Sequence, residues 1–455
     1  MATAPGPGIG IGIDVGTSSV SFAAWGPEGP EAELTLPNDS PLASGAGAAE
    51  QDPERILSIV LEGLAELVRG LGRAPASLCC TGQMHGLLLV GESLEPLTPL
   101  LTWQDRRAAA LARELDGRLE DRGSGSWMRR GCRLHPGYGG ATLVWLRSRG
   151  LPPRSHRACA ISDWVAARLC GRLATDPSNA ASWGIYNLGA ASWDGEAVEL
   201  LELGGELLPP VLEPGAPLGE VGRGLPAAGA LVRCGLGDNQ ASVLAATSEV
   251  GLDGTVVANI GTGSQVSVAA PEDAELGAGL SAGLEVRPLL PGRLLCVGAS
   301  LAGGAAYALL NRFFAEARNG ADGGTSEELY ELMEAWARSA PPGCDGLECD
   351  PSFLGERRGE GLTGSLRGLS ALTLSPAHLC RAVLEGMARR LRDLSASTGL
   401  PWSRLVGSGN AVRRSAVLRE ALAVAFGTPL VLSSCPEEAA AGAAMLAVRG
   451  ASGFR

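Results

Sequence analysis

The pattern of hydrophobic and polar positions near the N-terminus predicts a β-hairpin. Residues 9–13 form a short apolar run rich in β-branched residues, and residues 20–25 form a second run that ends before Gly26 and Pro27. The polar segment Asp14–Ser19 lies between them. Because strand, tight turn and strand follow one another directly, this order differs from the strand–loop–helix order of a P-loop or a dinucleotide-binding fold.

The hairpin pattern returns in the second half of the chain. Residues 255–260 form an apolar run, Gly261, Thr262, Gly263 and Ser264 form a polar turn, and residues 265–269 form the returning run. We interpret the repeat as an internal structural duplication and place the domain boundary near residues 245–250.

Between the hairpins and after them, helical patterns alternate with strands. Residues 52–71 repeat apolar side chains at helical spacing, and residues 77–81 form a strand that ends in the loop 82–86. Residues 204–229 are rich in Pro and Gly and predict irregular chain, and residues 320–350 predict loops around one helix. In the C-terminal part we expect helices at 378–394, 415–426 and 436–448 and a strand at 429–432. This alternation predicts an α/β fold.

Composition is that of a folded chain and excludes several functional classes. The chain has 455 residues, 45% hydrophobic and 19% charged, with a net charge of −12. At roughly 100–200 residues per domain, that length predicts about two to four domains. The acidic balance argues against a nucleic-acid scaffold, and no apolar run approaches the roughly 20 residues of a membrane span. The cysteine count is odd and no C-x-x-C spacing occurs, so we expect no structural zinc site. The N-terminus has no basic region of the kind found in secretory signals, so we expect a cytoplasmic protein with reduced thiols.

Two features of the composition change how motifs are interpreted. All 37 Lys and Arg residues are arginine, which removes the P-loop lysine and Schiff-base lysines from consideration. Glycine accounts for 65 residues, so a single glycine motif is weak evidence. A pair of Gly/Thr/Ser turns is stronger, because backbone N–H groups and hydroxyls in such turns bind phosphate without a lysine. Asp14 would repel bare phosphate, but it fits beside a bound Mg²⁺. The alternative is a pair of ordinary tight turns with an exposed Asp.

Five motifs in order along the chain resemble the FGGY carbohydrate kinases of the actin-like ATPase superfold. These are the segments Gly12–Ser19, Gly237–Gln240, Ile260–Ser264, Gly364–Glu385 and Gly407–Asn410. The resemblance implies two actin-like (ribonuclease H-like) α/β domains with a central cleft. Residues 1–247 would bind the sugar and carry the catalytic base, and residues 248–455 would bind the nucleotide. It also implies ATP as co-substrate, Mg²⁺, and a monomer or homodimer without nucleic-acid or membrane partners.

Within the family, several segments are similar to the kinases that phosphorylate the seven-carbon ketose sedoheptulose. They are Leu101–Asp105, Leu169–Gly171, Asn179–Asn187 and Phe353–Arg357. The segment Thr81–Gly86 is shared with the xylulose kinases and does not discriminate. The implied reaction phosphorylates the terminal primary hydroxyl to give sedoheptulose 7-phosphate for the pentose phosphate pathway. Two alternatives remain: a kinase of another ketose, chiefly xylulose, and a catalytically silent actin-like nucleotide-binding protein.

The resemblance assigns candidate residues to the sugar half of the site. Asp238, in a glycine-rich segment at a predicted helix start, is the candidate catalytic base, with a simple helix cap as the alternative. A ketose presents several hydroxyls, so its site needs side chains with donors and acceptors. The candidate sugar-binding residues are Gln83, Met84, His85, Trp103, Gln104, Asp105 and Asn239. Core packing of Trp103 and a buried structural His85 are the alternatives at those positions.

The resemblance also assigns the nucleotide half. The candidate nucleotide-binding residues are Asp14, Gly16, Thr17, Ser18, Ser19, Gly261, Thr262, Gly263, Ser264, Gly304, Gly407, Ser408, Gly409 and Asn410. Asp14 would hold Mg²⁺ through water. The chain departs from its apparent relatives at Ser21, where related kinases commonly carry Lys or Arg. From strand alternation we expect the side chain of residue 21 to lean toward the phosphates.

Overall fold

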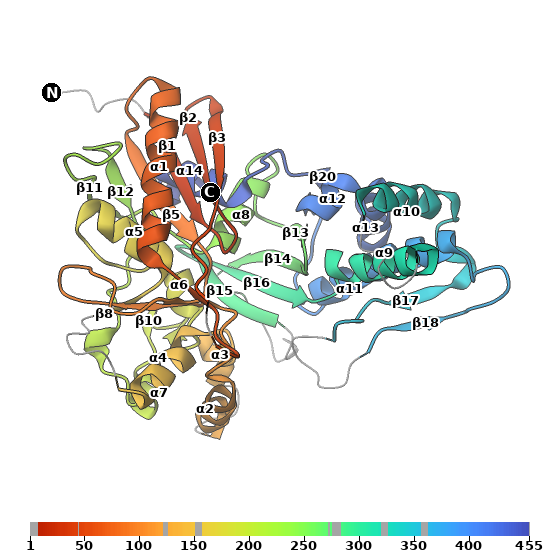
Figure 1. The fold of residues 1–455 in the computed structure, drawn as a ribbon, viewed down its shortest axis with the longest axis horizontal. Helices are drawn as coiled ribbons and strands as arrows, with labels where there is room; N and C mark the ends of the chain where they lie inside the picture. The colour runs from red at the N-terminus through yellow and green to blue at the C-terminus, as the bar shows by residue number, and fades with distance from the viewer. Residues whose placement is uncertain are drawn as a thin grey trace. The chain divides into compact units, whose positions relative to one another are not determined.

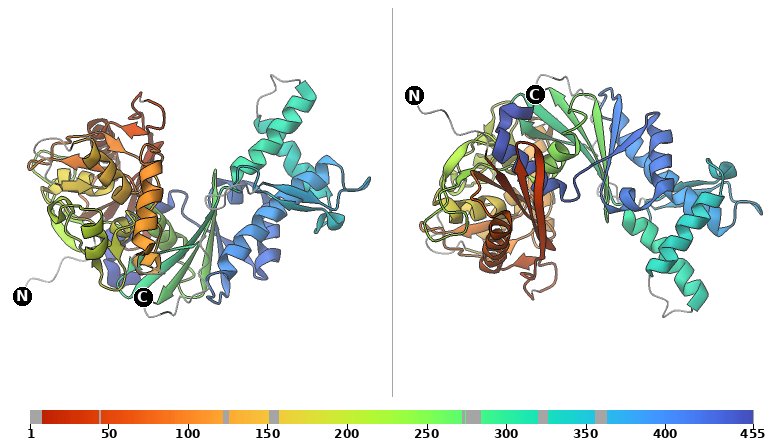
Figure 2. Two further views of the ribbon diagram at one scale, coloured as in Figure 1. Left: turned by 90° about the horizontal axis from the view of Figure 1, so that it is seen from below. Right: turned by 90° about the horizontal axis from the view of Figure 1, so that it is seen from above.

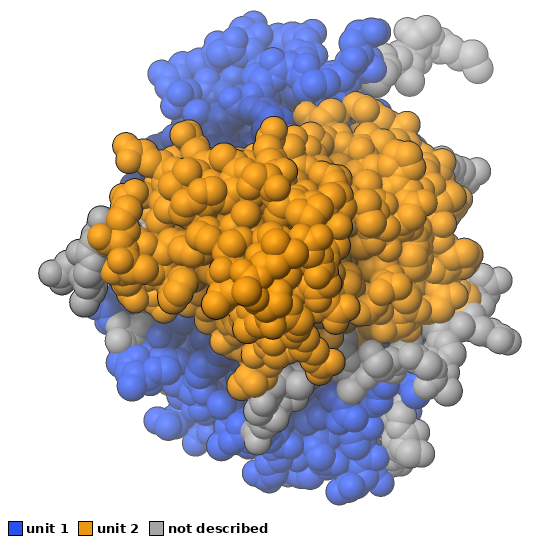
Figure 3. All heavy atoms as spheres, turned by 90° about the vertical axis from the view of Figure 1, so that its right-hand side faces the viewer, with its two compact units in different colours: residues 1–245, 286–294, 435–455 blue, residues 246–285, 295–434 orange. Residues whose placement is uncertain are grey.

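The computed structural model describes residues 8–43, 45–121, 126–150, 157–271, 274, 284–319, 326–355 and 363–454. The chain divides into two compact units, coloured separately in Figure 3. Unit 1 comprises residues 1–245, 286–294 and 435–455, and unit 2 comprises residues 246–285 and 295–434. The last helix of the chain therefore belongs to the first unit. The expected division of roles at residue 247 stays a prediction.

Unit 1 is built on a six-stranded mixed sheet with the order β11-β12-β5-β1-β2-β3. The predicted hairpin is β1 and β2, which pair antiparallel, while β5 runs parallel to β1 on its other side. The register places Asp14 opposite Ser21 on β2 and opposite Thr81 on β5. The strands of this sheet are β1 (Gly10–Val15), β2 (Ser19–Gly26), β3 (Gly29–Pro37), β5 (Ser77–Gly82), β11 (Pro217–Glu220) and β12 (Leu231–Arg233).

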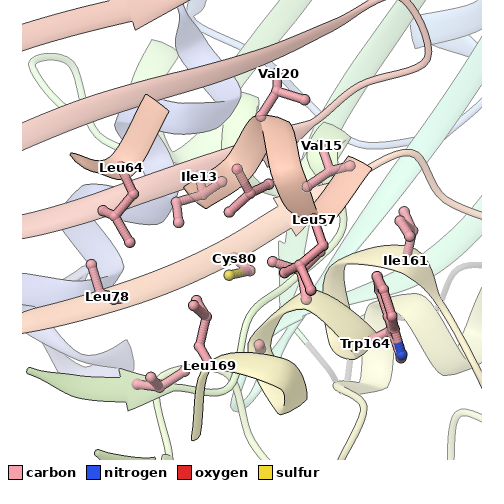
Figure 4. Packing of buried hydrophobic residues seen from close by; sticks show 14 of the residues in the cluster. Ile13, Val15, Val20, Leu57, Leu64, Leu78, Cys80, Ile161, Trp164 and Leu169 are labelled. Atoms are coloured by element: carbon pink, nitrogen blue, oxygen red, sulfur yellow. The ribbon is translucent and has the colours of Figure 1, made fainter. Parts of the chain in front are cut away.

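One face of this sheet is covered by α1 (Pro53–Leu71), which packs on β2 and β3 (Figures 1 and 2). The helix begins after Asp52, whose side chain accepts the Glu54 N–H, and ends at Gly72 in the left-handed conformation. Alternate β1 side chains such as Ile13 and Val15 belong to the same buried hydrophobic cluster as Leu57 of this helix (Figure 4). The predicted helix at residues 52–71 is confirmed.

The other face of the sheet is covered by α14 (Glu438–Arg449), which contacts β1, β2 and β5. Close approach depends on glycine: a Cβ on Gly12 would lie 1.9 Å from the Ala440 carbonyl oxygen. A Cβ on Gly442 would lie at the same 1.9 Å from the carbonyl oxygen of Ala241 in α8 (Asp238–Ala246). Helix α14 therefore packs between the first sheet and α8, the helix that begins at Asp238.

Unit 2 is built around the second six-stranded sheet, with the order β15-β16-β14-β13-β19-β20. The second hairpin, β13 and β14, is antiparallel, and β19 and β20 follow as parallel neighbours. This repeats the first sheet, in which β1 pairs with β2 on one side and with β5 and then β12 on the other. The predicted duplication is confirmed by this topology. The strands are β13 (Thr255–Ile260), β14 (Ser264–Pro271), β15 (Leu284–Leu290), β16 (Arg293–Ser300), β19 (Arg404–Ser408) and β20 (Leu430–Leu432).

The remaining elements surround the two sheets. In unit 1 the other helices are α2 (Ala109–Asp121), α3 (Ser126–Arg130), α4 (Gly139–Ser148), α5 (Ile161–Cys170), α6 (Pro177–Ala181) and α7 (Gly195–Leu200). Its short strands are β4 (Glu50–Gln51), β6 (Leu88–Val90), β7 (Leu100–Leu101), β8 (Arg157–Cys159), β9 (Tyr186–Asn187) and β10 (Ser192–Trp193). Unit 2 adds α9 (Gly304–Asn319), α10 (Glu327–Ser339), α11 (Pro376–Ala396), α12 (Asn410–Arg414), α13 (Ala416–Phe426), β17 (Glu348–Asp350) and β18 (Ser365–Arg367).

Two expectations need comment. Residues 204–229 are not wholly irregular, because β11 lies within them as an edge strand of the first sheet; its Pro and Gly are tolerated at an edge and hid it from pattern analysis. Residues 320–325 of the expected loop and Glu356 and Arg357 of the motif at 353–357 lie outside the described residues. Among the helices that the structure describes, none combines the length and the apolar character needed to cross a membrane.

Candidate active site

The loop that carries Asp238 is fixed against the end of β5. A Cβ on Gly235 would lie 1.9 Å from the carbonyl oxygen of Cys80, so only glycine permits this backbone approach. The Thr81 hydroxyl donates to the Leu236 carbonyl at 2.7 Å. Met84 packs on Gly237, where a Cβ would lie 2.4 Å from its sulfur. Asp238 then begins α8, half-buried, at a position set by the sheet rather than by a mobile loop.

The electrostatic surroundings of Asp238 suit a general base. Burial raises the pKa of its carboxyl to about 6, although the Asn239 N–H and Arg287 oppose the rise. The Asn239 N–H donates to Asp238 Oδ1 at 2.7 Å. Arg287, on β15, is only 4% exposed. A carboxyl with such a pKa is ionised at neutral pH and still accepts a proton more readily than an exposed Asp.

Asp14 lies at the end of β1, and the groups around its carboxyl differ from those around Asp238. Its Oδ1 is shielded from solvent and has no hydrogen-bond partner among the described residues. Burial, the carboxylate of Asp238 and that of Glu437 raise the pKa of Asp14 to about 8. A buried carboxyl oxygen facing two further acids is a position where a cation would relieve the repulsion.

The chemistry of this corner fits Mg²⁺, which prefers carboxylate oxygens and keeps several waters. Within the described part of the chain, no three His, Cys, Asp or Glu side chains converge closely enough to form a complete protein cage.

A hydrogen-bond chain links the first hairpin turn to the candidate sugar residues. Trp103 Nε1 donates to the Thr17 hydroxyl at 3.2 Å, and that hydroxyl donates to Gln83 Oε1 at 3.2 Å. Gln83 Nε2 in turn donates to Gln51 Oε1 at 2.7 Å, and Gln51 Nε2 donates to the Thr17 carbonyl at 2.8 Å. Thr17 thus ties the turn to the wall formed by Trp103. Gly16 and Ser18 are held by Asn38, which donates to the Gly16 carbonyl and to the Ser18 carbonyl, each at 2.9 Å.

His85 occupies a constrained position beside this wall. Its backbone is left-handed, with φ 75°, and its ring stacks on Tyr138 with centroids 4.1 Å apart. Its Nδ1 lies 2.9 Å from the Ser182 carbonyl, and its N–H donates to the Ser182 hydroxyl at 3.1 Å. Because a carbonyl only accepts, Nδ1 is the donor in this contact.

Asp105 is part of a charged cluster rather than an open binding group. Arg107 Nε lies 2.9 Å from Asp105 Oδ2, and the Ala49 N–H donates to the same oxygen at 3.1 Å. Arg107 also reaches Glu50 at 2.6 Å. Gln104, the next residue before Asp105, is exposed, and Asn239 is half-buried beside the candidate base.

In unit 2, the candidate nucleotide segments gather at one edge of the second sheet. The turn after β13 lies against the start of α9: the Gly304 N–H donates to the Gly261 carbonyl at 2.9 Å, and the Ser264 hydroxyl donates to the Ala302 carbonyl at 2.9 Å. A Cβ on Gly303 would lie 2.2 Å from the carbonyl carbon of Gly263. The turn holding Thr262 and the first residues of α9 therefore form one compact backbone surface.

The loop after β19 reaches the same edge, because β19 is the parallel neighbour of β13. Gly409 has φ +84°, and a Cβ there would lie 2.6 Å from the Ile260 carbonyl oxygen. Asn410 then begins α12. Ser408 is fully buried, with its hydroxyl 2.8 Å from Asn259 Nδ2, so its side chain supports the loop from within. Gly407 lies inside β19.

Comparison with known proteins decides the family. Models of the FGGY family of carbohydrate kinases match the chain with the N-terminal domain at residues 9–245 and the C-terminal domain at residues 256–451. The chain belongs to the FGGY family of carbohydrate kinases. It is therefore an ATP-dependent carbohydrate kinase, and the resemblance noted in the sequence is confirmed.

Similar proteins cover nearly the whole of this kinase. Sedoheptulokinase from Homo sapiens is 30% identical in an alignment that covers 96% of each chain. Glycerol kinase from Thermus brockianus is 30% identical, over 88% of this chain and 81% of that protein. The ligand-bound xylulose kinase structure from Lactobacillus acidophilus aligns with a TM-score of 0.83 at 23% identity, over 98% of this chain and 90% of that chain. The predicted α/β fold of two actin-like domains is confirmed.

Several residues that contact the candidate site residues could not be predicted from the sequence. They are Gln51, Tyr138, Ser178, Arg287 and Glu437. Each comes from an element far away in the chain, so no local spacing marks it. Ser182 lies within the motif Asn179–Asn187, to which no contact was assigned, and Ser178 directly precedes that motif.

The structure also changes the interpretation of Ser21. Its side chain is 2% exposed, and its hydroxyl accepts a hydrogen bond from Thr35 at 3.1 Å. An arginine at this position would have to be accommodated inside packed structure, across the strand from Asp14. Residue 21 is therefore a buried position, and its expected direction toward the phosphates stays a prediction.

Proposed function

We propose that this kinase transfers the γ-phosphoryl group of ATP to the terminal primary hydroxyl of sedoheptulose, giving sedoheptulose 7-phosphate for the pentose phosphate pathway. The observation that carries the reaction is Asp238, an immobilised carboxylate with a pKa near 6 at the start of α8. The substrate assignment is supported by the similarity to sedoheptulokinase over 96% of the chain.

In the proposed reaction Asp238 accepts the proton of the sugar hydroxyl as its oxygen attacks the γ-phosphorus. A new phosphorus–oxygen bond forms to the sugar, and the bond between the γ-phosphorus and the bridging oxygen of ADP breaks. General-base catalysis of this kind contributes typically about 10²–10⁴-fold to rate. The close packing of Gly235 and Gly237 fixes the loop before Asp238, so that the Asp238 carboxylate is held in one position relative to the sugar hydroxyl.

We propose that Asp14 holds Mg²⁺ through water, with Asp238 and Glu437 adding negative potential nearby. The ion would supply charge neutralisation on the phosphates, which this lysine-free chain must otherwise obtain from backbone N–H groups and arginine. Neutral Asp14 would be a poor partner for a cation, so binding of the ion is expected to accompany loss of the Asp14 proton.

For the sugar, we propose a wall of rings with polar groups at its edge. The stacked pair of His85 and Tyr138 offers a rigid face, and Trp103 is oriented by Thr17. Gln104 and Asn239 are the side chains proposed to bind hydroxyls directly. Gln83, Met84 and Asp105 stay candidates, but their contacts favour a supporting role, since Gln51, Gly237 and Arg107 respectively engage them.

For the nucleotide, we propose that the two hairpin turns bind the phosphates and that the loop at Gly409 and Asn410 lines the adenosine. Support comes from the gathering of the turn after β13, the start of α9 and the loop after β19 at one sheet edge. Glycine at these positions leaves the backbone accessible to a ligand.

The test is an ADP-release assay with a panel of acceptors: sedoheptulose, xylulose, glycerol and gluconate. We expect the highest kcat/KM with sedoheptulose, and loss of at least about 100-fold in kcat for Asp238→Asn. Preference for xylulose would favour the second candidate, which the shared segment Thr81–Gly86 supports. ATP binding without turnover of any acceptor would favour a silent nucleotide-binding protein.

A further inference from the structure

The short helix α6 makes contacts that its motif alone does not explain. Asp176 precedes it and is fully buried. Its Oδ1 accepts the Ser178 N–H at 2.7 Å and also the Ser178 hydroxyl, while its Oδ2 accepts Asn179 Nδ2 at 2.7 Å. These bonds cap the helix and fix the orientation of both side chains.

The Ser178 hydroxyl is therefore oriented. Its hydrogen points to Asp176, so its lone pairs remain for a donor. That donor is the backbone N–H of Gly237, 2.8 Å from Ser178 Oγ, in a buried contact between residues 59 positions apart. Gly237 directly precedes Asp238. The amide that anchors the candidate base is thus held by a side chain from a different element.

The far end of the same helix holds His85. The Ser182 hydroxyl donates to the Asn179 carbonyl at 2.7 Å and accepts the His85 N–H at 3.1 Å. Ser182 also supplies the carbonyl that fixes the His85 ring. One rigid turn, residues 176–182, therefore contacts both the segment of the base and the histidine of the sugar wall.

We infer that Ser178 is a positioning residue for the phosphoryl-transfer reaction: through the Gly237 N–H it sets the position of Asp238 relative to the sugar wall that Ser182 anchors. This inference rests on the proposed role of Asp238. The Leu236 carbonyl is tied separately by Thr81, so loss of Ser178 would free the side of the loop next to the base while the other side stays attached.

The experiment compares Ser178→Ala, which removes the hydroxyl, with Ser178→Thr, which keeps it. Ser162→Ala is the matched control, because Ser162 and Ser178 are each 1% exposed, and within the described residues the Ser162 hydroxyl has no hydrogen-bond partner. A shift of about 1 Å in a reacting group costs on the order of 100-fold in rate. We expect Ser178→Ala to lower kcat by about 10- to 100-fold, with KM for ATP changed less than about twofold.

Rescue separates positioning from general destabilisation. We expect Ser178→Thr to recover kcat to within about fivefold of wild type. We expect Ser162→Ala to keep full kcat, although it also removes a buried hydroxyl. Ser182→Ala should instead raise KM for the sugar, because it removes the hydroxyl that accepts the His85 N–H and leaves only the contact of the ring with the backbone carbonyl. Full kcat in folded Ser178→Ala, or failure of Ser178→Thr to rescue a folded enzyme, would overturn the inference.

Two further measurements keep the result decisive. If Ser178→Ala does not fold, Ser178→Cys keeps the side-chain volume with a much weaker acceptor, and undiminished kcat there would overturn the inference. Asp238→Asn is assayed in parallel. Full activity of that variant would refute the proposed base itself, whereas an inactive Asp238→Asn with a fully active Ser178→Ala would refute only the positioning role.

Discussion

Asp14→Asn is expected to make the ligand-free protein more stable at neutral pH while abolishing kinase activity. The wild-type carboxyl has a buried oxygen without a hydrogen-bond partner among the described residues, and two other acids face it. An amide removes the charge and keeps the shape. The position would then be one where the native residue costs folding free energy because it serves a ligand that the free protein lacks.

The magnitude follows from the pKa of Asp14, about 8 in the folded protein against an ordinary value of 3.8. Below roughly pH 4 the folded and unfolded carboxyls are both protonated, and they differ little. Between roughly pH 4 and 8 only the unfolded carboxyl is ionised, so the free energy of unfolding falls as pH rises. Above the folded pKa both are ionised and the cost is constant. At about 1.4 kcal/mol per pH unit the upper limit at pH 7 is about 4 kcal/mol. Because Asp14 is only half-buried, we expect about 2 kcal/mol.

The assay is urea unfolding followed by tryptophan fluorescence from pH 4 to 8.5, in wild type and Asp14→Asn without ligands. We expect the stability difference to be near zero at pH 4 and to grow in favour of Asp14→Asn up to about pH 8. Glu437→Gln is the control, because it removes one source of the raised pKa and should reduce the slope only partly. A variant less stable than wild type at pH 7, or a difference independent of pH, would refute the reasoning.

The remaining predictions concern catalysis and binding. With Asp238 as base and its pKa near 6, kcat/KM for the sugar should fall about tenfold per pH unit below about pH 6; a flat profile to pH 5 would exclude this base. Gly409→Ala should raise KM for ATP about tenfold or more, since its Cβ would lie 2.6 Å from a carbonyl oxygen, whereas Gly427→Ala, with φ +65° and no neighbour within 4 Å, should leave KM for ATP unchanged. Tyr138→Ala should raise KM for the sugar about 3- to 10-fold through loss of the stack on His85, and Tyr138→Phe should not; equal loss in both would assign the effect to the hydroxyl.

The parts of the fold that could be predicted are those with local signals. Both hairpins are apolar runs around polar turns, and α1 has its cap, its stripe and its terminal glycine within one segment. The place of α14 could not be predicted. It lies against the first sheet because Gly12 and Gly442 allow close approach, and that complementarity joins residues more than 400 positions apart in the chain only once the fold has formed.

The candidate site divides in the same way. Asp238 became the candidate base through the family resemblance of its glycine-rich segment, whereas the groups that surround its carboxyl could not be predicted. Arg287 comes from β15 and Ser178 from α6, and neither has a motif that points to a carboxylate elsewhere. At Ser21, strand alternation predicts which face of the sheet the side chain lies on but not whether that face is covered, so the 2% exposure of this residue could not be predicted.

The two hairpins share the same strand pairing but differ in the polar side chain near the end of their first strand. In the first, the last polar residue of the strand is Asp14, whose partner in register on β5 is Thr81. Thr81 donates its hydroxyl to Leu236, so Asp14 Oδ1 keeps no partner within the described residues. In the second, the matching residue is Asn259, whose partner in register on β19 is Ser408, and the two side chains bond at 2.8 Å. Within the described residues, the first hairpin therefore carries a buried carboxyl oxygen without a hydrogen-bond partner, whereas the matching side chain of the second hairpin, Asn259, is bonded to Ser408. If Asp14 holds a cation through water, as proposed above, that difference separates the roles of the two turns.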